Sequence, residues 1–210
     1  NYALDLLEDG EWALFMVDDL INVSLLDTYF IEQNNKLNID FDNQGTYRKK
    51  FKFNCDAHRF LNVCNDTIKH AEEKNYNLCG FSLTNNPTWR GKKYTYRSLA
   101  DGRCWLVKKS DLKQDINVNC IEDYAFTALN LKKFGGIVIN NWLLPECKRY
   151  GEGGYGSIEK RMKQKIKECK YLTETYPEYL AYAPKKGLPE NAHIRVRQLK
   201  TINIKQQSLF

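Results

Sequence analysis

The sequence predicts an α/β fold with a mostly parallel central sheet flanked by helices and a small antiparallel addition. Two observations predict it. Short apolar runs alternate with amphipathic helical patterns along the 210 residues, and this length suffices to bury one full core. Apolar residues make up 42% of the chain and charged residues 28%, as in globular rather than disordered proteins. No linker composition divides the chain, so we expect one domain over residues 1–210, with a basic helical region, 151–210, packed on it.

The first half is expected to supply three strands and a helix. Residues 12–17 form an apolar run that ends at two aspartates, as a buried parallel strand does when it delivers carboxylates. Residues 24–44 are polar and predict a loop, and the aromatic and basic alternation of 47–53 predicts a strand. A helix that Asn54 or Asp56 caps is expected to run to about Lys74. Residues 78–83 predict the next strand.

The middle of the chain carries strong turn signals. Residues 84–91 contain Asn-Asn-Pro and predict a loop. Residues 94–99 and 104–108 predict two strands around an Asp101-Gly102 turn, which is typical of a β-hairpin.

The second half predicts two further helices. One opens at residue 120, reaches Lys133 and is stopped by Gly135-Gly136, with a strand over 137–143 after it. The other is long and basic, with Ser157 as its cap and an end near Thr175. Residues 194–199 predict a last strand.

Composition excludes several classes of protein. The seven cysteines are odd in number and form no CxxC pair, which argues against a zinc site or a disulfide framework and favours reduced thiols in a cytoplasmic protein. The longest apolar runs are too short to span a bilayer, so we expect no membrane partner. Residues 151–210 hold 12 Lys and Arg against 6 Asp and Glu, whereas residues 1–150 hold 20 of each. This basic region fits either a polyanionic partner or a solvated helix.

Asp18 and Asp19 are the first candidate site residues. They follow the first apolar strand, and ligands of open α/β sheets bind beyond the carboxyl ends of strands. Adjacent carboxylates repel each other unless a cation lies beside them, and Mg²⁺ or Mn²⁺ is held by one or two carboxylates plus substrate phosphates. The alternative is an exposed acidic turn or a helix cap.

Glu122 and Asp123 form the second motif, at the start of the helix that follows Cys120. A carboxylate at a helix start is favoured by the helix dipole, so simple capping explains it. Held in a cleft, the same carboxylate accepts a proton from an attacking hydroxyl.

Three weaker signals remain. A glycine-rich stretch after Lys148 and Arg149, with Gly153 and Gly154 at its centre, fits a phosphate-holding loop or a flexible turn. Trp89 and Arg90 fit stacking on a base or sugar, or a Trp packed on the sheet. His193 is a candidate third metal ligand, although a lone histidine is usually structural.

In order, the segments 12–20 and 120–130 resemble the acidic strand end and the acidic helix start of nucleotide-sugar glycosyltransferases of the GT-A fold. More narrowly, Val-Asp-Asp-Leu-Ile, the Glu-Asp helix, the glycine loop and Ile-Arg-Val-Arg at 194–197 resemble the phage TET-associated glycosyltransferases. That group adds sugars to modified DNA bases such as 5-hydroxymethylcytosine. The family also has a first strand with a nucleotide-contacting loop, and we expect no strand before Trp12 in this chain.

The resemblance implies a UDP-sugar donor and a divalent metal, Mn²⁺ or Mg²⁺. It assigns the metal to Asp19, with Asp18 beside it, and the catalytic base to Asp123, with Glu122 holding the acceptor or the sugar. The acceptor it implies is a hydroxymethylated base in phage DNA, drawn in by the basic region. The residues that would contact the donor or the phosphates are Asp18, Asp19, Trp89, Arg90, Lys148, Arg149, Gly153 and Gly154.

Three alternatives stay open. A nucleotidyltransferase would need a glycine-rich phosphate loop near the N-terminus, which the sequence does not show. A non-catalytic nucleic-acid-binding module would leave Asp18 and Asp19 structural. A glycan or protein glycosyltransferase differs only in its acceptor.

Overall fold

The computed structural model describes residues 2–26, 52–83, 92–147 and 157–198. The helices in this part of the chain are α1 (Tyr2–Asp5), α4 (Ala57–Glu72), α5 (Glu122–Phe134) and α6 (Ile158–Thr175). The strands are β1 (Trp12–Met16), β2 (Leu20–Leu26), β3 (Lys52–Asn54), β4 (Leu78–Phe81), β5 (Tyr94–Thr95), β6 (Cys104–Lys108), β7 (Val138–Asn140), β8 (Leu143–Cys147), β9 (Leu180–Tyr182) and β10 (Ile194–Val196).

The central sheet has the strand order β1-β6-β4-β7-β5. Strand β6 is antiparallel to both of its neighbours, β1 and β4, and β5 is antiparallel to β7. Only the β4–β7 pair is parallel among the described strands. The α/β class is therefore confirmed, but the expected mostly parallel sheet is wrong, because β6 is inserted between two strands that run the opposite way.

Two local expectations about this sheet are also wrong. Strand β1 is not a buried parallel strand: it pairs with β6 alone among the described strands, and its side chains are only partly buried. The expected hairpin around Asp101-Gly102 does not form, since β5 pairs with β7 while β6 pairs with β1 and β4. The Asp-Gly sequence is typical of a hairpin turn, but the strands on its two sides pair with other strands.

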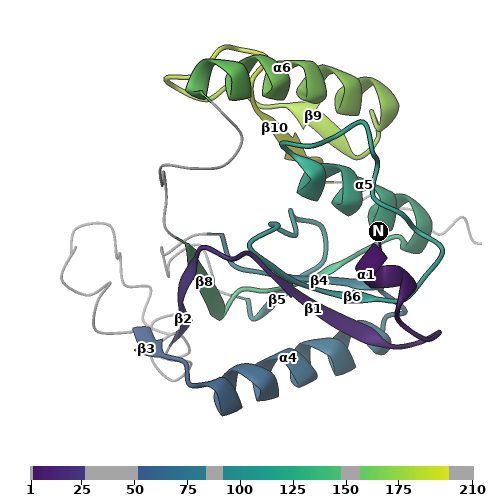
Figure 1. Ribbon diagram of the computed structural model, residues 1–210. Coiled ribbons are helices and arrows are strands. Elements are labelled where there is room, and N and C mark those ends of the chain that lie inside the picture. The colour runs from purple at the N-terminus through teal and green to yellow at the C-terminus, as the bar shows by residue number, and fades with distance from the viewer. Residues whose placement is uncertain (1, 27–51, 84–91, 148–156, 199–210) are drawn as a thin grey trace, which may run out of the picture.

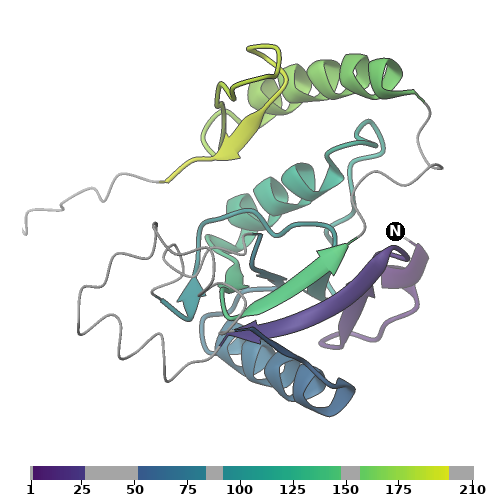
Figure 2. The ribbon, with the colours of Figure 1, turned by 90° about the vertical axis from the view of Figure 1, so that its left-hand side faces the viewer.

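Helices cover both faces of the sheet. Figure 1 shows α4 beneath it and α5 above it, and Figure 2 shows the same order after a quarter turn. The unit made of α6, β9 and β10 lies on the far side of α5 in both views. One apolar cluster extends from the sheet through α5 into this unit, because it includes Trp105, Phe126, Leu172 and Ile194.

Alternation along β6 explains why both faces need a helix. Trp105 and Val107 belong to the cluster under α5, whereas Cys104 and Leu106 belong to the cluster over α4. Successive side chains of a strand point to opposite faces, so an apolar run on a central strand needs cover on both sides.

The helix ends follow local rules, as expected. Asp56 caps α4 by accepting from the Arg59 N–H at 2.8 Å, and Ser157 caps α6 by accepting from the Lys160 N–H. Gly135 ends α5 in the left-handed conformation, with φ of 79°. These three helices are confirmed within a residue or two.

A second sheet, β3-β2-β8, flanks the central one, and β9 and β10 form an antiparallel pair. The expected loop over 24–44 is wrong at its start, since β2 runs to Leu26. The expected strand over 137–143 is two strands, β7 and β8, because residues 141–142 turn between them. Strand β3 confirms only the end of the expected strand over 47–53; residues 47–51 lie outside the described part.

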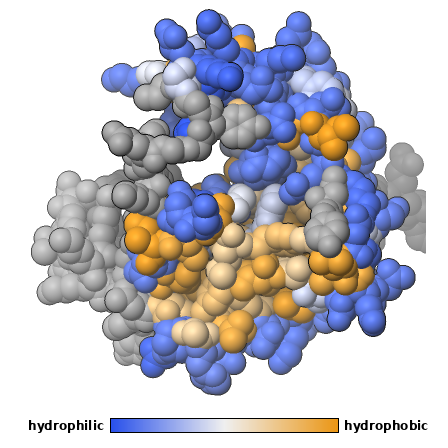
Figure 3. All heavy atoms as spheres, viewed as in Figure 1, coloured by the Kyte–Doolittle hydropathy of each residue, from blue (hydrophilic) through white to orange (hydrophobic). Residues whose placement is uncertain are grey.

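Apolar side chains gather on the face over β1 and β2, as Figure 3 shows. Met16 of β1 and Ile21 of β2 are 50% and 68% exposed. Among the described residues, no helix is long and apolar enough to cross a membrane. All seven cysteines are free thiols.

Candidate functional site

Three strands of the central sheet end at the same edge. Strands β1 and β4 are both antiparallel to β6, and β7 is parallel to β4, so β1, β4 and β7 run in one direction. Their carboxyl ends are followed by Asp18-Asp19, by Ser82-Leu83 and by Asn141, respectively. Strand β6 begins at this edge, which also brings the Asp101–Arg103 turn there. Ligands of α/β sheets commonly bind beyond such an edge.

Asp18 and Asp19 form the turn between β1 and β2. Both are exposed, and the Leu20 N–H donates to the Val17 carbonyl at 3.4 Å to close the turn. The end of β1 is joined to the Asp101–Arg103 turn, because the Val17 N–H donates to the Arg103 carbonyl at 3.1 Å.

The Asp101–Arg103 turn packs against the first turn of α5. The Arg103 guanidinium donates to Asp101 at 2.6 Å and to the Pro145 carbonyl at 3.4 Å. A Cβ placed on Gly102 would lie 3.6 Å from the Glu122 carboxylate and 3.7 Å from the Asp123 Cβ. The turn therefore lies in van der Waals range of both acids, and we call Asp101, Glu122 and Asp123 the acid cluster.

Asp123 is half-buried and has the most perturbed carboxyl in this cluster. Burial, then the negative charges of Asp101 and Glu122, raise the pKa of Asp123 to about 7. The backbone N–H groups of Tyr124 and Gly102 act against this rise by donating to the carboxylate. Burial also raises the pKa of Glu122. The dipole of α5 favours charge here, but burial and like charges outweigh it.

Cys147 connects the acidic turn with the acid cluster. The pKa of its thiol is raised to about 11 by burial, by the charge of Asp19 and by a hydrogen bond from the thiol to Asp19. Arg103 and Asp101 also act on this thiol electrostatically. The Asp101–Arg103 turn thus neighbours both acidic regions expected from the sequence, and Cys147 interacts with this turn and with Asp19.

Glu168 of α6 holds the segment that leads into α5. It is 1% exposed, and its two oxygens accept from the backbone N–H groups of Asn119, Cys120 and Ile121 at 2.9, 2.9 and 3.2 Å. The Gln164 amide donates to it as well, at 2.7 Å. The N-cap residue of α5, Ile121, has no capping side chain, so a carboxylate from another helix supplies the acceptors. Sequence reasoning missed this residue; its position on the apolar face of α6 was the signal.

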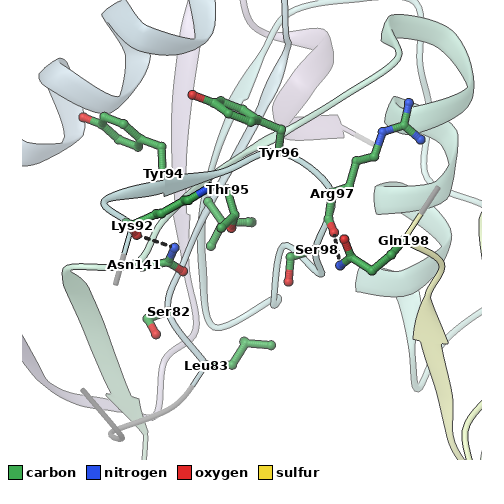
Figure 4. A pocket seen from close by; sticks show the side chains of 11 residues that line it. Ser82, Leu83, Lys92, Tyr94, Thr95, Tyr96, Arg97, Ser98, Asn141 and Gln198 are labelled. Atoms are coloured by element: carbon green, nitrogen blue, oxygen red, sulfur yellow. Dashed lines mark hydrogen bonds between the residues drawn. The ribbon is translucent and has the colours of Figure 1, made fainter. Parts of the chain in front are cut away.

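A pocket of about 650 Å³ opens at the ends of β4 and β7, which is within the size range of ligand sites. Figure 4 shows its lining from several elements. Residues that follow β4 and β7 line it, together with β5, the segment after β5, and Gln198 beyond β10. Sequence reasoning missed this pocket because its walls come from segments far apart in the chain.

Several predicted residues do not join this site. His193 lies on the β9–β10 pair, where its Nδ1 is 2.9 Å from the Ala183 carbonyl. The described residues contain no group of three or more His, Cys, Asp or Glu that could hold a metal ion, so His193 does not complete a set with Asp18 and Asp19. The remaining predicted contacts, Trp89, Arg90, Lys148, Arg149, Gly153 and Gly154, lie outside the described residues.

Comparison with known proteins adds no assignment. The chemistry of this chain must therefore be argued from its side chains rather than from a shared fold. No protein-family model matches the chain, and no curated protein or solved structure is significantly similar to it.

Proposed function

We propose that this protein is a glycosyltransferase that moves a sugar from a UDP-sugar to a hydroxyl acceptor. The observation that carries the proposal is Asp123, whose pKa of about 7 suits a base at neutral pH. It lies beside the Asp101–Arg103 turn, which also bonds to the strand end before Asp18 and Asp19. The resemblance of the two acidic segments to GT-A enzymes points the same way.

Asp123 would act as the general base. Its carboxylate takes the proton from the acceptor hydroxyl, whose oxygen then bonds to the anomeric carbon of the sugar. The bond from that carbon to the diphosphate oxygen breaks, and the nucleoside diphosphate leaves with the electron pair. The Gly102 and Tyr124 N–H groups orient the carboxylate, and Glu122 lies beside it to hold a sugar or acceptor hydroxyl.

Asp18 and Asp19 can hold a divalent ion only if the substrate supplies further ligands to it. Two exposed, adjacent carboxylates match the one or two that Mg²⁺ or Mn²⁺ takes from proteins when phosphates and water complete its shell. With no third protein ligand grouped with them among the described residues, we assign the ion to these two aspartates and the diphosphate. Such an ion supplies charge neutralisation for the leaving diphosphate.

The acceptor that the resemblance favours is a hydroxymethylated base in DNA. Helix α6 carries a run of basic residues on exposed positions, among them Lys160, Lys163, Lys167 and Lys170. Such a surface attracts phosphates with a salt-sensitive affinity. The same surface favours the second candidate, a nucleic-acid-binding module without catalysis.

The test measures UDP release from a panel of UDP-sugars with Mn²⁺, using an oligonucleotide that contains 5-hydroxymethylcytosine and the same oligonucleotide with cytosine. We expect Asp123→Asn to lower kcat by about 10²–10⁴-fold, the usual contribution of a general base. Asp19→Ala should also lose turnover, and its loss should not be restored by raising the acceptor concentration. Asp66→Asn, an exposed acid on α4, is the matched control and should retain full activity.

Full turnover in Asp123→Asn would refute the role of this base. DNA binding without UDP release in any variant would refute catalysis and support the binding module. Release with a glycan acceptor but not with DNA would keep the transferase and change its acceptor.

A further inference from the structure

The pocket beyond β4 and β7 lies at a junction of three parts of the molecule. Ser82 and Leu83 continue β4, Asn141 follows β7, and Gln198 reaches in from the C-terminal unit. Figure 4 shows these residues around one opening, with Thr95 and Ser98 between them. Pockets at such junctions are usual places for ligands.

The lining combines polar and apolar surface, and its charged residues are Lys92 and Arg97. None of the described lining residues is acidic, in contrast with the neighbouring acid cluster. Three hydroxyl side chains, Ser82, Thr95 and Ser98, line it, and the apolar contribution comes from Leu83 and Ile139.

The basic and aromatic residues contribute less to the interior. Figure 4 shows the Arg97 guanidinium and the rings of Tyr94 and Tyr96 directed away from Ser82 and Leu83. The Arg97 guanidinium donates to the Gly135 carbonyl at 3.0 Å, and the Tyr94 ring stacks on His70. Lys92 is the remaining cation of the described lining.

Two amides are held with a fixed orientation. The Asn141 amide nitrogen donates to the Lys92 carbonyl at 2.9 Å, and the Gln198 amide nitrogen donates to the Arg97 carbonyl at 3.0 Å. Each side chain keeps its carbonyl oxygen as an acceptor and one further N–H as a donor. The pocket therefore offers acceptors and hydroxyls, which match a ligand rich in O–H donors.

The pocket adjoins the chain segment that leads to the acid cluster. Ser98 is three residues from Asp101, a span of at most about 11 Å for an extended chain. Between them, the Ala100 N–H donates to the Thr127 hydroxyl of α5 at 3.2 Å, which holds the segment against the helix that carries Asp123. A ring bound beside Ser98 would thus lie one short chain segment from Asp101 of the acid cluster.

We propose that this pocket binds a sugar ring. Hydroxyls and amide carbonyls pair with the hydroxyls of a pyranose, and Leu83 and Ile139 can contact its apolar C–H faces. A diphosphate would need several convergent charged donors, and the described lining offers Lys92, since the Arg97 guanidinium is directed away and donates to the Gly135 carbonyl. The proposal rests on the glycosyl-transfer proposal for its role, with either the donor or a glycan acceptor supplying the ring, but binding itself can be measured alone.

The experiment uses saturation-transfer NMR and calorimetry on the full chain, with UDP-glucose, UDP and maltotriose as probes. Thr95→Val removes a hydroxyl while keeping the side-chain shape and the strand preference, and Ser98→Leu fills the pocket. We expect Thr95→Val to weaken binding of the sugar probe about tenfold, the effect of one lost hydrogen bond, and Ser98→Leu to abolish it. Thr175→Val, at the exposed end of α6, is the control and should bind as the wild type does.

The probes separate the two sources of the ring. If the variants bind UDP-glucose more weakly but bind UDP as the wild type does, the ring in the pocket belongs to the donor. If the variants bind maltotriose more weakly, the ring belongs to an acceptor. Unchanged affinity of both sugar probes in both variants, or no saturation transfer to either sugar, overturns the proposal. Because binding is measured without turnover, the two proposals can fail separately. Sugar binding without UDP release would support the pocket and refute the transferase. UDP release without sugar binding in the pocket would support the transferase and refute the pocket.

Discussion

Replacing Glu168 should loosen the start of α5 and destabilise the protein. In Glu168→Gln, the side-chain oxygen can still accept from two backbone N–H groups if it takes the position that faces Cys120 and Ile121. The new amide group then faces the Asn119 N–H, which loses its acceptor. Gln164 can rotate its own amide and present its oxygen instead.

The cost of Glu168→Gln therefore comes from one lost backbone hydrogen bond to a buried charge, about 1.5–3 kcal/mol. Glu168→Ala leaves all three backbone donors without this acceptor, so its cost should be roughly twice as large or more. Glu174→Gln on the exposed side of the same helix is the control and should change the free energy of unfolding by less than about 0.5 kcal/mol.

Urea unfolding measures the free energies, and hydrogen exchange at residues 119–121 localises the effect. Faster exchange is expected at these amides in Glu168→Gln and not in the control. If Glu168→Gln unfolds at the same urea concentration as the wild type and these amides keep their protection, the carboxylate does not hold the segment, and the reasoning fails.

Three further predictions concern a carboxyl and two glycines. Burial and the charge of Asp101 raise the pKa of Asp123 to about 7. The folded protein therefore keeps a proton on this carboxyl that the unfolded chain releases from about pH 4 upward. As a result, the free energy of unfolding falls as the pH rises toward 7. Asp123→Asn should remove this loss, which amounts to about 4 kcal/mol for about three pKa units at about 1.4 kcal/mol each. In urea unfolding the variant should therefore gain up to about this much over the wild type at pH 8 but little at pH 4, and an equal gain at both pH values would contradict the reasoning. Gly80→Ala should lower the free energy of unfolding by about 1–3 kcal/mol in the same assay, because its Cβ would lie 2.8 Å from the Ala100 Cα. An unchanged free energy of unfolding would mean that the backbone shifts to make room for the Cβ. Gly135→Ala should cost about 1 kcal/mol by thermal unfolding because of its positive φ, and Gly135→Asn should cost less.

Helix ends could be predicted from the sequence because they depend on neighbours in the chain. Asp56 and Ser157 each bond an N–H three residues away, and Gly135 relieves a local backbone constraint. Such signals are complete within a few residues, so α4, α5 and α6 were predicted with nearly correct bounds.

Strand pairing could not be predicted in the same way. The pattern around Asp101-Gly102 favoured a hairpin, but the partners of β6 are β4 and β1, and β1 lies near the start of the chain. Alternation of apolar residues reports that a strand is buried and does not report its neighbour.

The residues of the candidate site also divide into those that a local motif predicts and those that only distant contacts bring in. The two acidic segments were visible as sequence motifs. The contributions of Arg103, Cys147 and Glu168 depend on contacts with distant segments, such as the one between Glu168 and residues 119–121. No local pattern marks Arg103 or Cys147, and the one signal for Glu168 is its position on the apolar face of α6.

The insertion of β6 between β1 and β4 also constrains the order in which the protein can fold. Trp12 pairs with Lys108, and β4 reaches its other partner, β7, later still, so neither β1 nor β4 has its sheet neighbours when it leaves the ribosome. When β4 leaves the ribosome, all of α4 has already been synthesised. This helix can form early because its N-cap residue, Asp56, lies next to it in the chain. Closure of such distant pairs is slow, so we expect nascent chains shorter than about 110 residues to lack the central sheet and to need protection for the apolar side chains of β1.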